Sequence, residues 1–432
     1  MTIGFQLVDL SPNLGHDNRL RLQYIVVSFP QTHRPFTAEP PKVSIEDFSP
    51  NVEHLEPSST LVLAARARAL KADGVPVVDL SAGEPQYASP AFALQAATSA
   101  IEAGKTGYPP TSGLPELRQA IAAYLTETTA TTAVDPTEVI VSAGVKQALF
   151  NCCYALFGEG DEVLIPTPYW VSYPALVDLA GAKSVFVDTA WDDGLLVSVE
   201  QLEAARSSKT RGLLLNSPSN PSGAVYDLKH LTEILVWAAE HDIWVLSDEI
   251  YRRLAYENAA PSVFDIPDRG DHVILLDGVS KAFCMPGFRI GYAVGPEQLI
   301  RKTTDLQGQT TSGAAGPSQY AAAAALNQSD AREAFVTNLV SQLHILRDIG
   351  ISRLQAIDAI EVQPAPGALY FYVKLLDDSK SSMEVAEDLL LNGLVASVPG
   401  EPFGSPGHLR FNFAVERPVL EEGLERITAF FE

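Results

Sequence analysis

The sequence is poor in cysteine and in basic residues, and each shortage excludes a class of protein. Three cysteines in 432 residues cannot form a disulfide framework, and Cys152 and Cys153 are adjacent in an apolar, helix-like run. Such residues are typical of a core in a reducing compartment, so we expect a cytoplasmic protein. The 30 basic residues are outnumbered by 53 acidic ones, which leaves a net charge of −23. This charge repels nucleic acids and anionic membrane surfaces, so we expect neither as a partner.

Long hydrophobic runs and metal-binding histidine patterns are also lacking. No apolar run approaches the length that crosses a bilayer, and the eight histidines show no metal-ligand spacing. The apolar stretch at residues 22–29 follows Arg19 and Arg21, as in a signal peptide. Asp9 and Asp17, and the lack of a small-residue cleavage pattern, argue against that interpretation.

The composition that remains is typical of a globular protein, with 46% hydrophobic and 19% charged residues. The length allows about two to three domains. Short apolar runs that are typical of strands alternate with helix-like segments up to about residue 300. This alternation predicts an α/β fold in which a mainly parallel sheet is sandwiched between helices.

The other segments predict the domain organisation. Residues 1–50 contain scattered prolines and no sustained period, so we expect an N-terminal arm or extension. Residues 51–325 form the predicted large domain, and residues near 51–75 contribute to a smaller one. Aromatic and β-branched residues at 368–373 predict a strand of a second sheet, so residues 326–432 form the predicted small α+β domain.

Three polar residues follow short apolar runs of the predicted large sheet. Asn220, Asp248 and Lys281 each come shortly after a run that is typical of a buried strand. Parallel strands deliver their carboxyl ends to one edge of a sheet, where open α/β sheets bind ligands. We therefore expect an amide, a carboxylate and an amine to lie close together at this edge. The runs are residues 211–215, 243–246 and 273–276.

The motifs around these residues resemble a known family. They are Asn-Pro-Ser-Gly at 220–223, Ser-Asp-Glu-Ile-Tyr at 247–251, and Ser-Lys at 280–281 followed by Gly-Phe-Arg-Ile-Gly at 287–291. Together they resemble the signature of fold-type I, pyridoxal-phosphate-dependent class I/II aminotransferases. The resemblance extends from about residue 55 to the C-terminus. It is greatest to bacterial type Ib aspartate aminotransferases, some of which also act on prephenate.

The resemblance implies a catalytic role for each strand-end residue. Lys281 would hold pyridoxal phosphate as a Schiff base, and its freed amine would move the substrate's Cα proton. Asp248 would keep the pyridine nitrogen protonated, which makes the ring an electron sink. Asn220 and Tyr251 would donate hydrogen bonds to the ring's phenolate oxygen. The large domain would therefore be the cofactor-binding domain.

The resemblance also implies how the phosphate is held. Ser280 and Arg289 would bind it together with the backbone at Gly144 and Val145. The local pattern fits this role, because a strand, a glycine and a helix start leave free N–H groups at a helix N-terminus.

Two aromatic residues complete the implied cofactor site. Trp170 would stack on the ring. Tyr108, in a Tyr-Pro-Pro-x-x-Gly loop, would reach the phosphate of the neighbouring subunit, which implies a homodimer with shared active sites.

The substrate residues are also implied by the resemblance. Arg410 would bind the α-carboxylate through its planar fork, and Gly83 lies in a glycine turn over the substrate. Lys146 would bind the distal carboxylate of an acidic substrate, together with the hydroxyls of Ser58 and Thr60.

Each residue also has an ordinary structural interpretation. Lys281 alone is typical of a surface lysine after a strand, and Asp248 of a helix N-cap. Tyr251 and Trp170 fit a protein core. Lys146 fits a solvated first helical turn, although a cation at a helix N-terminus is disfavoured without an anion nearby.

Four positions depart from the family pattern. Asp277 replaces the usual asparagine, Ser222 a threonine and Phe288 a tryptophan, while Pro286 stands where threonine is usual. Pro286 removes a backbone donor and a hydroxyl near Lys281.

The resemblance predicts transfer of an amino group between an acidic L-amino acid and a 2-oxo acid. Aspartate or glutamate, or prephenate and arogenate, are the expected substrates. Another pyridoxal-phosphate reaction, such as elimination, substitution or cyclisation, is the alternative, because fold does not fix function. A non-catalytic ligand sensor would need a fused DNA-binding module, and residues 1–50 are too short and insufficiently basic for one.

Overall fold

The computed structural model describes residues 5–6, 26–27, 49, 52, 59–131 and 133–432. The chain separates into two compact units, Met1–His54 and Leu55–Glu432. In the first unit, β1 (Phe5–Gln6) pairs antiparallel with β2 (Val26–Val27). All further elements belong to the second unit.

A seven-stranded sheet forms the centre of the second unit, in the order β4-β10-β9-β8-β7-β5-β6. All its strands are parallel except β10, which runs antiparallel to both neighbours. The prediction of an α/β fold with a mainly parallel sheet is confirmed, and the structure adds one antiparallel strand. The strands are β4 (Val139–Ser142), β5 (Glu162–Pro166), β6 (Lys183–Val187), β7 (Thr210–Asn216), β8 (Trp244–Asp248), β9 (Val273–Gly278) and β10 (Gly291–Val294).

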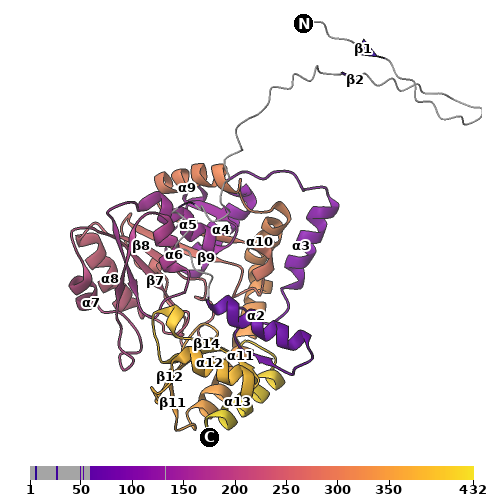
Figure 1. The fold of residues 1–432 in the computed structure, drawn as a ribbon. Helices are drawn as coiled ribbons and strands as arrows, with labels where there is room; N and C mark the ends of the chain where they lie inside the picture. The colour runs from indigo at the N-terminus through magenta and orange to yellow at the C-terminus, as the bar shows by residue number, and fades with distance from the viewer. Residues whose placement is uncertain (1–4, 7–25, 28–48, 50–51, 53–58, 132) are drawn as a thin grey trace, which may run out of the picture. The chain divides into compact units, whose positions relative to one another are not determined.

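Helices cover both faces of this sheet (Figure 1). Strand residues alternate between the faces, and both sets are apolar, so the central strands are buried on both sides. On one face lie α5 (Val145–Leu156), α6 (Tyr173–Leu179) and α9 (Glu297–Thr310). On the other lie α4 (Pro115–Thr128), α7 (Val199–Ala205), α8 (Leu228–Glu240) and α10 (Gly316–Asn327), with α3 (Ala91–Glu102) packed beside α10.

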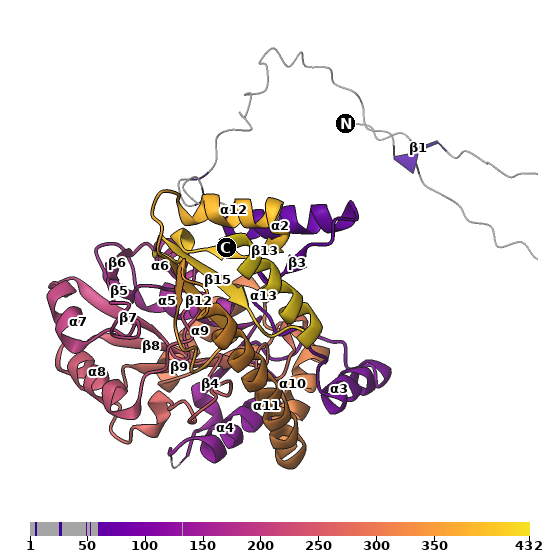
Figure 2. The same cartoon turned by 90° about the horizontal axis from the view of Figure 1, so that it is seen from below.

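A second, antiparallel sheet has the order β11-β12-β15-β14. Its strands are β11 (Ile360–Val362), β12 (Tyr370–Leu375), β14 (Val398–Pro399) and β15 (His408–Asn412). Figure 2 shows α11 (Ser329–Leu354), α12 (Ser382–Asn392) and α13 (Arg417–Phe431) around this sheet. Nearby, β3 (Val78–Asp79) pairs parallel with β13 (Val395–Ala396), and an ion pair between Arg66 and Glu387 joins α2 (Ser59–Ala72) to α12.

Short 3₁₀ helices lie in four of the connections. They are η1 (Pro136–Glu138), η2 (Val263–Asp265), η3 (Pro286–Phe288) and η4 (Glu401–Phe403). Two of them, η3 and η4, adjoin the cavity described below.

Most predicted elements are confirmed, and the errors lie at their ends. The strand predicted at 139–142 is β4, and the helix predicted at 59–72 is α2. The prediction that the strand before Lys281 ends ahead of Asp277 was wrong, because β9 continues to Gly278. The reversed strand β10 supplies the missing partner, since Gly291 pairs with Gly278 and Tyr292 with Asp277.

The described residues contain neither a membrane-spanning helix nor a metal-binding cluster. None of the described helices combines the length and apolarity that a membrane span requires. Histidine, cysteine and carboxylate side chains of the described residues nowhere gather in threes that could bind a metal. The three cysteines are buried and free.

Candidate active site

A cavity of about 570 Å³ lies at the carboxyl ends of β7, β8 and β9. Its other walls come from residues 81–84, from the start of α5 and from the small antiparallel sheet. Many residues predicted from the sequence line it together: Gly83, Val145, Lys146, Trp170, Asn220, Asp248, Tyr251, Ser280, Lys281, Arg289 and Arg410. The segments that carry them are far apart in the sequence, so only the folded chain assembles this set.

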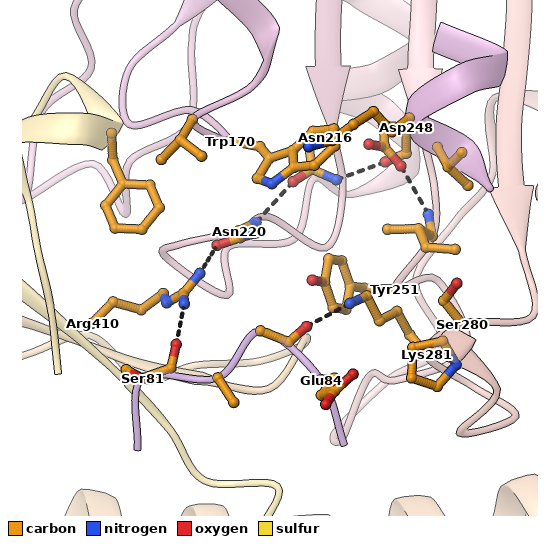
Figure 3. A pocket seen from close by; sticks show the side chains of 18 of the residues that line it. Ser81, Glu84, Trp170, Asn216, Asn220, Asp248, Tyr251, Ser280, Lys281 and Arg410 are labelled. Atoms are coloured by element: carbon orange, nitrogen blue, oxygen red, sulfur yellow. Dashed lines mark hydrogen bonds between the residues drawn. The ribbon is translucent and has the colours of Figure 1, made fainter. Parts of the chain in front are cut away.

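Lys281 follows β9 in the turn that β9 and β10 enclose. Its Nζ donates a hydrogen bond to the Gly83 carbonyl and lies 5.6 Å from the centre of the Tyr251 ring (Figure 3). Burial, and then the positive charge of Arg410, lower the pKa of the amine to about 8. A larger fraction of Lys281 is therefore neutral near pH 7 than in a solvated lysine, which suits a nucleophile or a base.

Asp248 ends β8 and is 4% exposed. Its Oδ2 accepts a 2.9 Å hydrogen bond from the Tyr173 hydroxyl, and its Oδ1 accepts one from the Ile250 N–H. Burial raises the pKa of Asp248 to about 6, while the bond from Tyr173 opposes that rise. The carboxylate is thus ionised at neutral pH and can pair with a cationic nitrogen in the cavity.

A chain of hydrogen bonds connects the two sheets across the cavity, as the dashed lines in Figure 3 show. Arg410 donates from Nη1 to Asn220 Oδ1 at 2.8 Å and from Nη2 to the Ser81 carbonyl at 2.9 Å. The Asn220 N–H donates to Asn216 Oδ1, and Asn216 Nδ2 donates to the Asp248 carbonyl. These bonds hold the loop after β7 between Arg410 and Asp248.

The Arg410 guanidinium is buried but retains unused binding capacity. It lies 4.3 Å from the centre of the Tyr370 ring and 5.2 Å from that of Phe403. Its Nε atom has no hydrogen-bond partner within the described chain. A buried arginine with an unpaired donor, aimed into a cavity, is suited to a carboxylate ligand. Tyr251 lies nearby, and its hydroxyl is 2.7 Å from that of Tyr370.

The start of α5 and Arg289 form a positively charged cradle. Gly144 precedes the helix with φ 87° and ψ 164° and provides no side-chain cap, so helix N–H groups remain free. Arg289 donates to the Pro286 carbonyl at 3.1 Å and to the Ala143 carbonyl at 3.4 Å. A Cβ at Gly144 would lie 2.4 Å from Arg289 Nη2, so glycine is what allows the guanidinium to approach the helix. Such a cradle binds phosphate or carboxylate groups.

Two further cations reach the cavity without an acidic partner. Lys146 Nζ lies 5.0 Å from the centre of the Trp170 ring, which in turn packs edge-on against Tyr173. Burial, and then the charge of Arg289, lower the pKa of Lys146. Arg68 enters from α2, and within the described residues it makes no hydrogen bond or ion pair. Both side chains can therefore bind an anionic ligand.

Some predicted residues do not reach the cavity. Tyr108 is 98% exposed and lies outside it. Gly144 stands behind Arg289 rather than at the cavity surface. Ser58 lies outside the described residues, and so does the side chain of Thr60, whose backbone belongs to α2.

Sequence reasoning also missed several residues of the cavity and its support. Tyr173 lies three positions after Trp170 in the same aromatic segment, and that proximity could have identified it. Tyr370 belongs to a strand that was predicted, but its face could not be assigned without a partner strand. No local pattern marks the others. They are Arg68, Ser81, Glu84, Asn216 and Phe403.

Comparisons with known proteins identify the family of the chain. The family described as aminotransferase class I and II matches residues 75–427. The chain is 40% identical over 398 residues to an aspartate aminotransferase of Streptomyces avermitilis, which covers 88% of the chain and 95% of that protein. It is 38% identical over 378 residues to the aspartate/prephenate aminotransferase of Thermus thermophilus, with 88% and 97% covered.

Solved structures give the same result for the fold. A structure of Thermus thermophilus aspartate aminotransferase with maleate matches with a TM-score of 0.86 and 36% identity, covering 89% of this chain and 99% of that one. The aspartate aminotransferase of Rhizobium meliloti matches with a TM-score of 0.84 and 35% identity, covering 89% and 98%.

Proposed function

Because the chain belongs to the class I and II aminotransferase family, we propose that it transfers an amino group between an acidic L-amino acid and a 2-oxo acid, with pyridoxal phosphate as its cofactor. One observation carries the proposal. A single cavity contains an amine of lowered pKa at Lys281, a buried carboxylate at Asp248, and an arginine with an unused donor at Arg410.

The residues present fit this cofactor. The cradle of Arg289 and the α5 N-terminus suits its phosphate, and Ser280 lines the same part of the cavity. Lys281 would hold its carbonyl carbon, and Asp248 would pair with its ring nitrogen. When bound, the cofactor supplies an electron sink for the substrate Cα and carries the amino group.

The side chains of the chain would bind the substrate and move its proton. Arg410 would orient the α-carboxylate, because its fork is held from behind by Asn220 and Ser81. The Lys281 amine, once free, would take the proton from Cα as a general base. Tyr251 and Asn220 would donate hydrogen bonds to the cofactor's ring oxygen.

Unpaired cations support an acidic substrate. Lys146 and Arg68 line the cavity, and neither has an acidic partner among the described residues. A distal carboxylate would satisfy either of them. The names of the relatives, aspartate and aspartate/prephenate aminotransferase, are consistent with this substrate class. We include prephenate and arogenate among the proposed substrates.

A homodimer with shared sites is part of the proposal. A tyrosine that is 98% exposed is unusual for a monomer surface, and two prolines follow Tyr108 in a stiff loop. We propose that Tyr108 completes the phosphate site of a second copy of the chain. The free, buried cysteines support a cytoplasmic location.

An assay of amino transfer with a matched pair of lysine variants tests the proposal. Purified protein with pyridoxal phosphate should convert aspartate or glutamate only when a 2-oxo acid is supplied. Lys281→Ala should reduce turnover by at least about 10²–10⁴-fold, as expected when a positioned base is lost. Lys229→Ala, an exposed lysine on α8, serves as the control.

Two outcomes would contradict the proposal. Normal turnover in Lys281→Ala would refute the role of Lys281. Consumption of the amino acid without consumption of a 2-oxo acid would favour elimination or substitution instead. Pro286, which lines the cavity and offers no N–H or hydroxyl, is the residue that keeps this alternative open.

A further inference from the structure

A buried polar network lies behind the candidate site, on the opposite face of the large sheet. Asp248 pairs with Leu276 across β8 and β9, so these two side chains share one face. Glu249 and Asp277 each follow by one residue and therefore point to the other face. Tyr292, which pairs with Asp277, lies in the apolar core of that face.

The two carboxyls of this network are deeply buried, at 1% exposure for Glu249 and 5% for Asp277. Asp277 is fully supplied with donors, because Oδ1 accepts from the Gly278 N–H at 2.6 Å and Oδ2 from the Tyr292 hydroxyl at 3.1 Å. Glu249 is not. Its Oε1 accepts from the Ser247 hydroxyl and from a backbone N–H, whereas Oε2 has no hydrogen-bond partner within the described chain.

The charges that face these carboxyls include one cation. Arg252 Nε lies 3.6 Å from Glu249 Oε2, and its other nitrogens donate to Thr128 of α4. The ring of Tyr124, also on α4, lies 5.9 Å from the guanidinium. One arginine can neutralise one of two buried carboxylates. A second buried negative charge is costly, and a proton removes that cost.

The distribution of donors indicates where the proton belongs. Both oxygens of Asp277 accept hydrogen bonds, which suits its charged form, whereas Glu249 Oε2 accepts none and lies 3.6 Å from Arg252 Nε, so it can carry a hydrogen. The pKa values agree in order. Burial raises the pKa of Glu249 to about 7 and that of Asp277 to about 6, while Arg252 lowers both.

The network is coupled to the candidate site through charge and through the chain. The charge of Glu249 raises the pKa of Asp248, and the charge of Asp248 raises that of Asp277. Asp277 also lies at the end of β9, three and four residues before Ser280 and Lys281. We propose that Glu249 and Asp277 share one proton beside Arg252, and that they act as positioning residues that set the electrostatic field at Asp248. This inference rests on the proposed function, because Asp248 acts there as the partner of the cofactor nitrogen.

The consequence depends on pH. Between about pH 6 and 7 the network holds one proton and is neutral overall. As the pH rises the proton leaves, and the new negative charge behind β8 opposes the ionisation of Asp248. Asparagine at position 277 leaves Glu249 paired with Arg252, so the network stays neutral at every pH of interest.

The first experiment follows thermal unfolding of the full chain with cofactor from pH 5 to 8.5. A folded-state pKa above the unfolded value means that stability is lost as pH rises through it. The melting temperature of Asp277→Asn minus that of the unsubstituted protein should therefore increase between pH 5 and 8. Asp227→Asn is the matched control, because Asp227 also accepts from a backbone N–H but is exposed. Its difference from the unsubstituted protein should not vary with pH.

The second experiment compares pH profiles of kcat/KM. Asp277→Asn should steepen the acidic limb and move its midpoint to lower pH, because no second negative charge then develops behind β8 while Asp248 ionises. Glu249→Gln should move it in the same direction, which guards against a folding defect in either variant.

The outcomes separate the claims. Parallel melting profiles would overturn the shared proton, and an unmoved acidic limb would overturn the link to Asp248. If the variants lose the same amount of stability at every pH, Glu249 and Asp277 have only a structural role. If the unsubstituted protein transfers no amino group, the proposed function fails, while the melting profiles still test the shared proton.

Discussion

Replacing Gly144 by alanine should weaken cofactor binding far more than it weakens the fold. The new Cβ would lie 2.4 Å from Arg289 Nη2, so the guanidinium must leave the α5 N-terminus. The guanidinium is the end of a flexible and exposed side chain, and its movement therefore costs the fold little. Arg289 would then lose the position from which we propose that it binds the phosphate.

The loss of folding stability and the loss of cofactor affinity can be estimated separately from the structure. Gly144 has φ 87° and ψ 164°, a region that side chains rarely adopt, and forcing alanine there costs about 1–3 kcal/mol of stability. A hydrogen bond to a charged group contributes about 1.5–3 kcal/mol. Losing the contact of Arg289 with the phosphate should thus weaken the affinity for pyridoxal phosphate by about 10-fold to 150-fold.

A second glycine isolates the backbone strain. Gly160 has φ 94°, and a Cβ there would meet nothing within 4 Å. Gly160→Ala should therefore lower the free energy of unfolding but leave cofactor affinity unchanged. Both quantities are measured by thermal or denaturant unfolding and by titration of the cofactor-free protein with pyridoxal phosphate. If Gly144→Ala binds the cofactor as tightly as Gly160→Ala, Arg289 does not hold the phosphate.

Two more predictions concern specificity and pH. Lys146→Ala and Arg68→Ala should each raise KM for aspartate and glutamate by about tenfold or more, and should change KM for an apolar donor little. Arg66 lies on the same helix as Arg68 but is paired with Glu387, so Arg66→Ala should leave KM for acidic and apolar donors unchanged. Equal effects on acidic and apolar donors would remove the case for an acidic substrate. Tyr173→Phe should move the acidic limb of kcat/KM to higher pH. The pKa of Asp248 is about 6, and the hydrogen bond from Tyr173 keeps it from rising further. Without that bond, the carboxylate, which must be ionised to act, becomes ionised only at higher pH. A limb that stays in place would mean that Asp248 does not govern it.

The strand-end residues could be predicted because a simple rule governs them. Asn220, Asp248 and Lys281 follow apolar runs, and parallel strands bring their carboxyl ends to one edge whatever the details of packing. The structure places all three in one cavity. Arg68 shows the limit of that rule. It belongs to a helix outside the large sheet, and only the packing of α2 and the small sheet across the cavity brings it there.

The extent of β9 was mispredicted for a related reason. Asp277 and Gly278 are typical of a turn, yet they continue the strand because β10 returns beside them. That return depends on a pairing across the sequence, which local composition does not encode. A carboxylate was consequently expected in a loop and is found in a buried strand, where its charge has far larger effects.

The position of Arg410 in the chain affects the order in which the protein can become active. Lys281 and the strands that present it precede the small antiparallel sheet, whereas Arg410 lies in β15, close to the C-terminus. Chains are synthesised from the N-terminus, and folding of a large protein follows in segments. A nascent chain would thus contain Lys281 and the proposed phosphate cradle before it contains Arg410, the proposed partner of the substrate carboxylate. With Arg410 as the proposed partner of the substrate carboxylate, that binding site is complete only after β15 has joined the small antiparallel sheet.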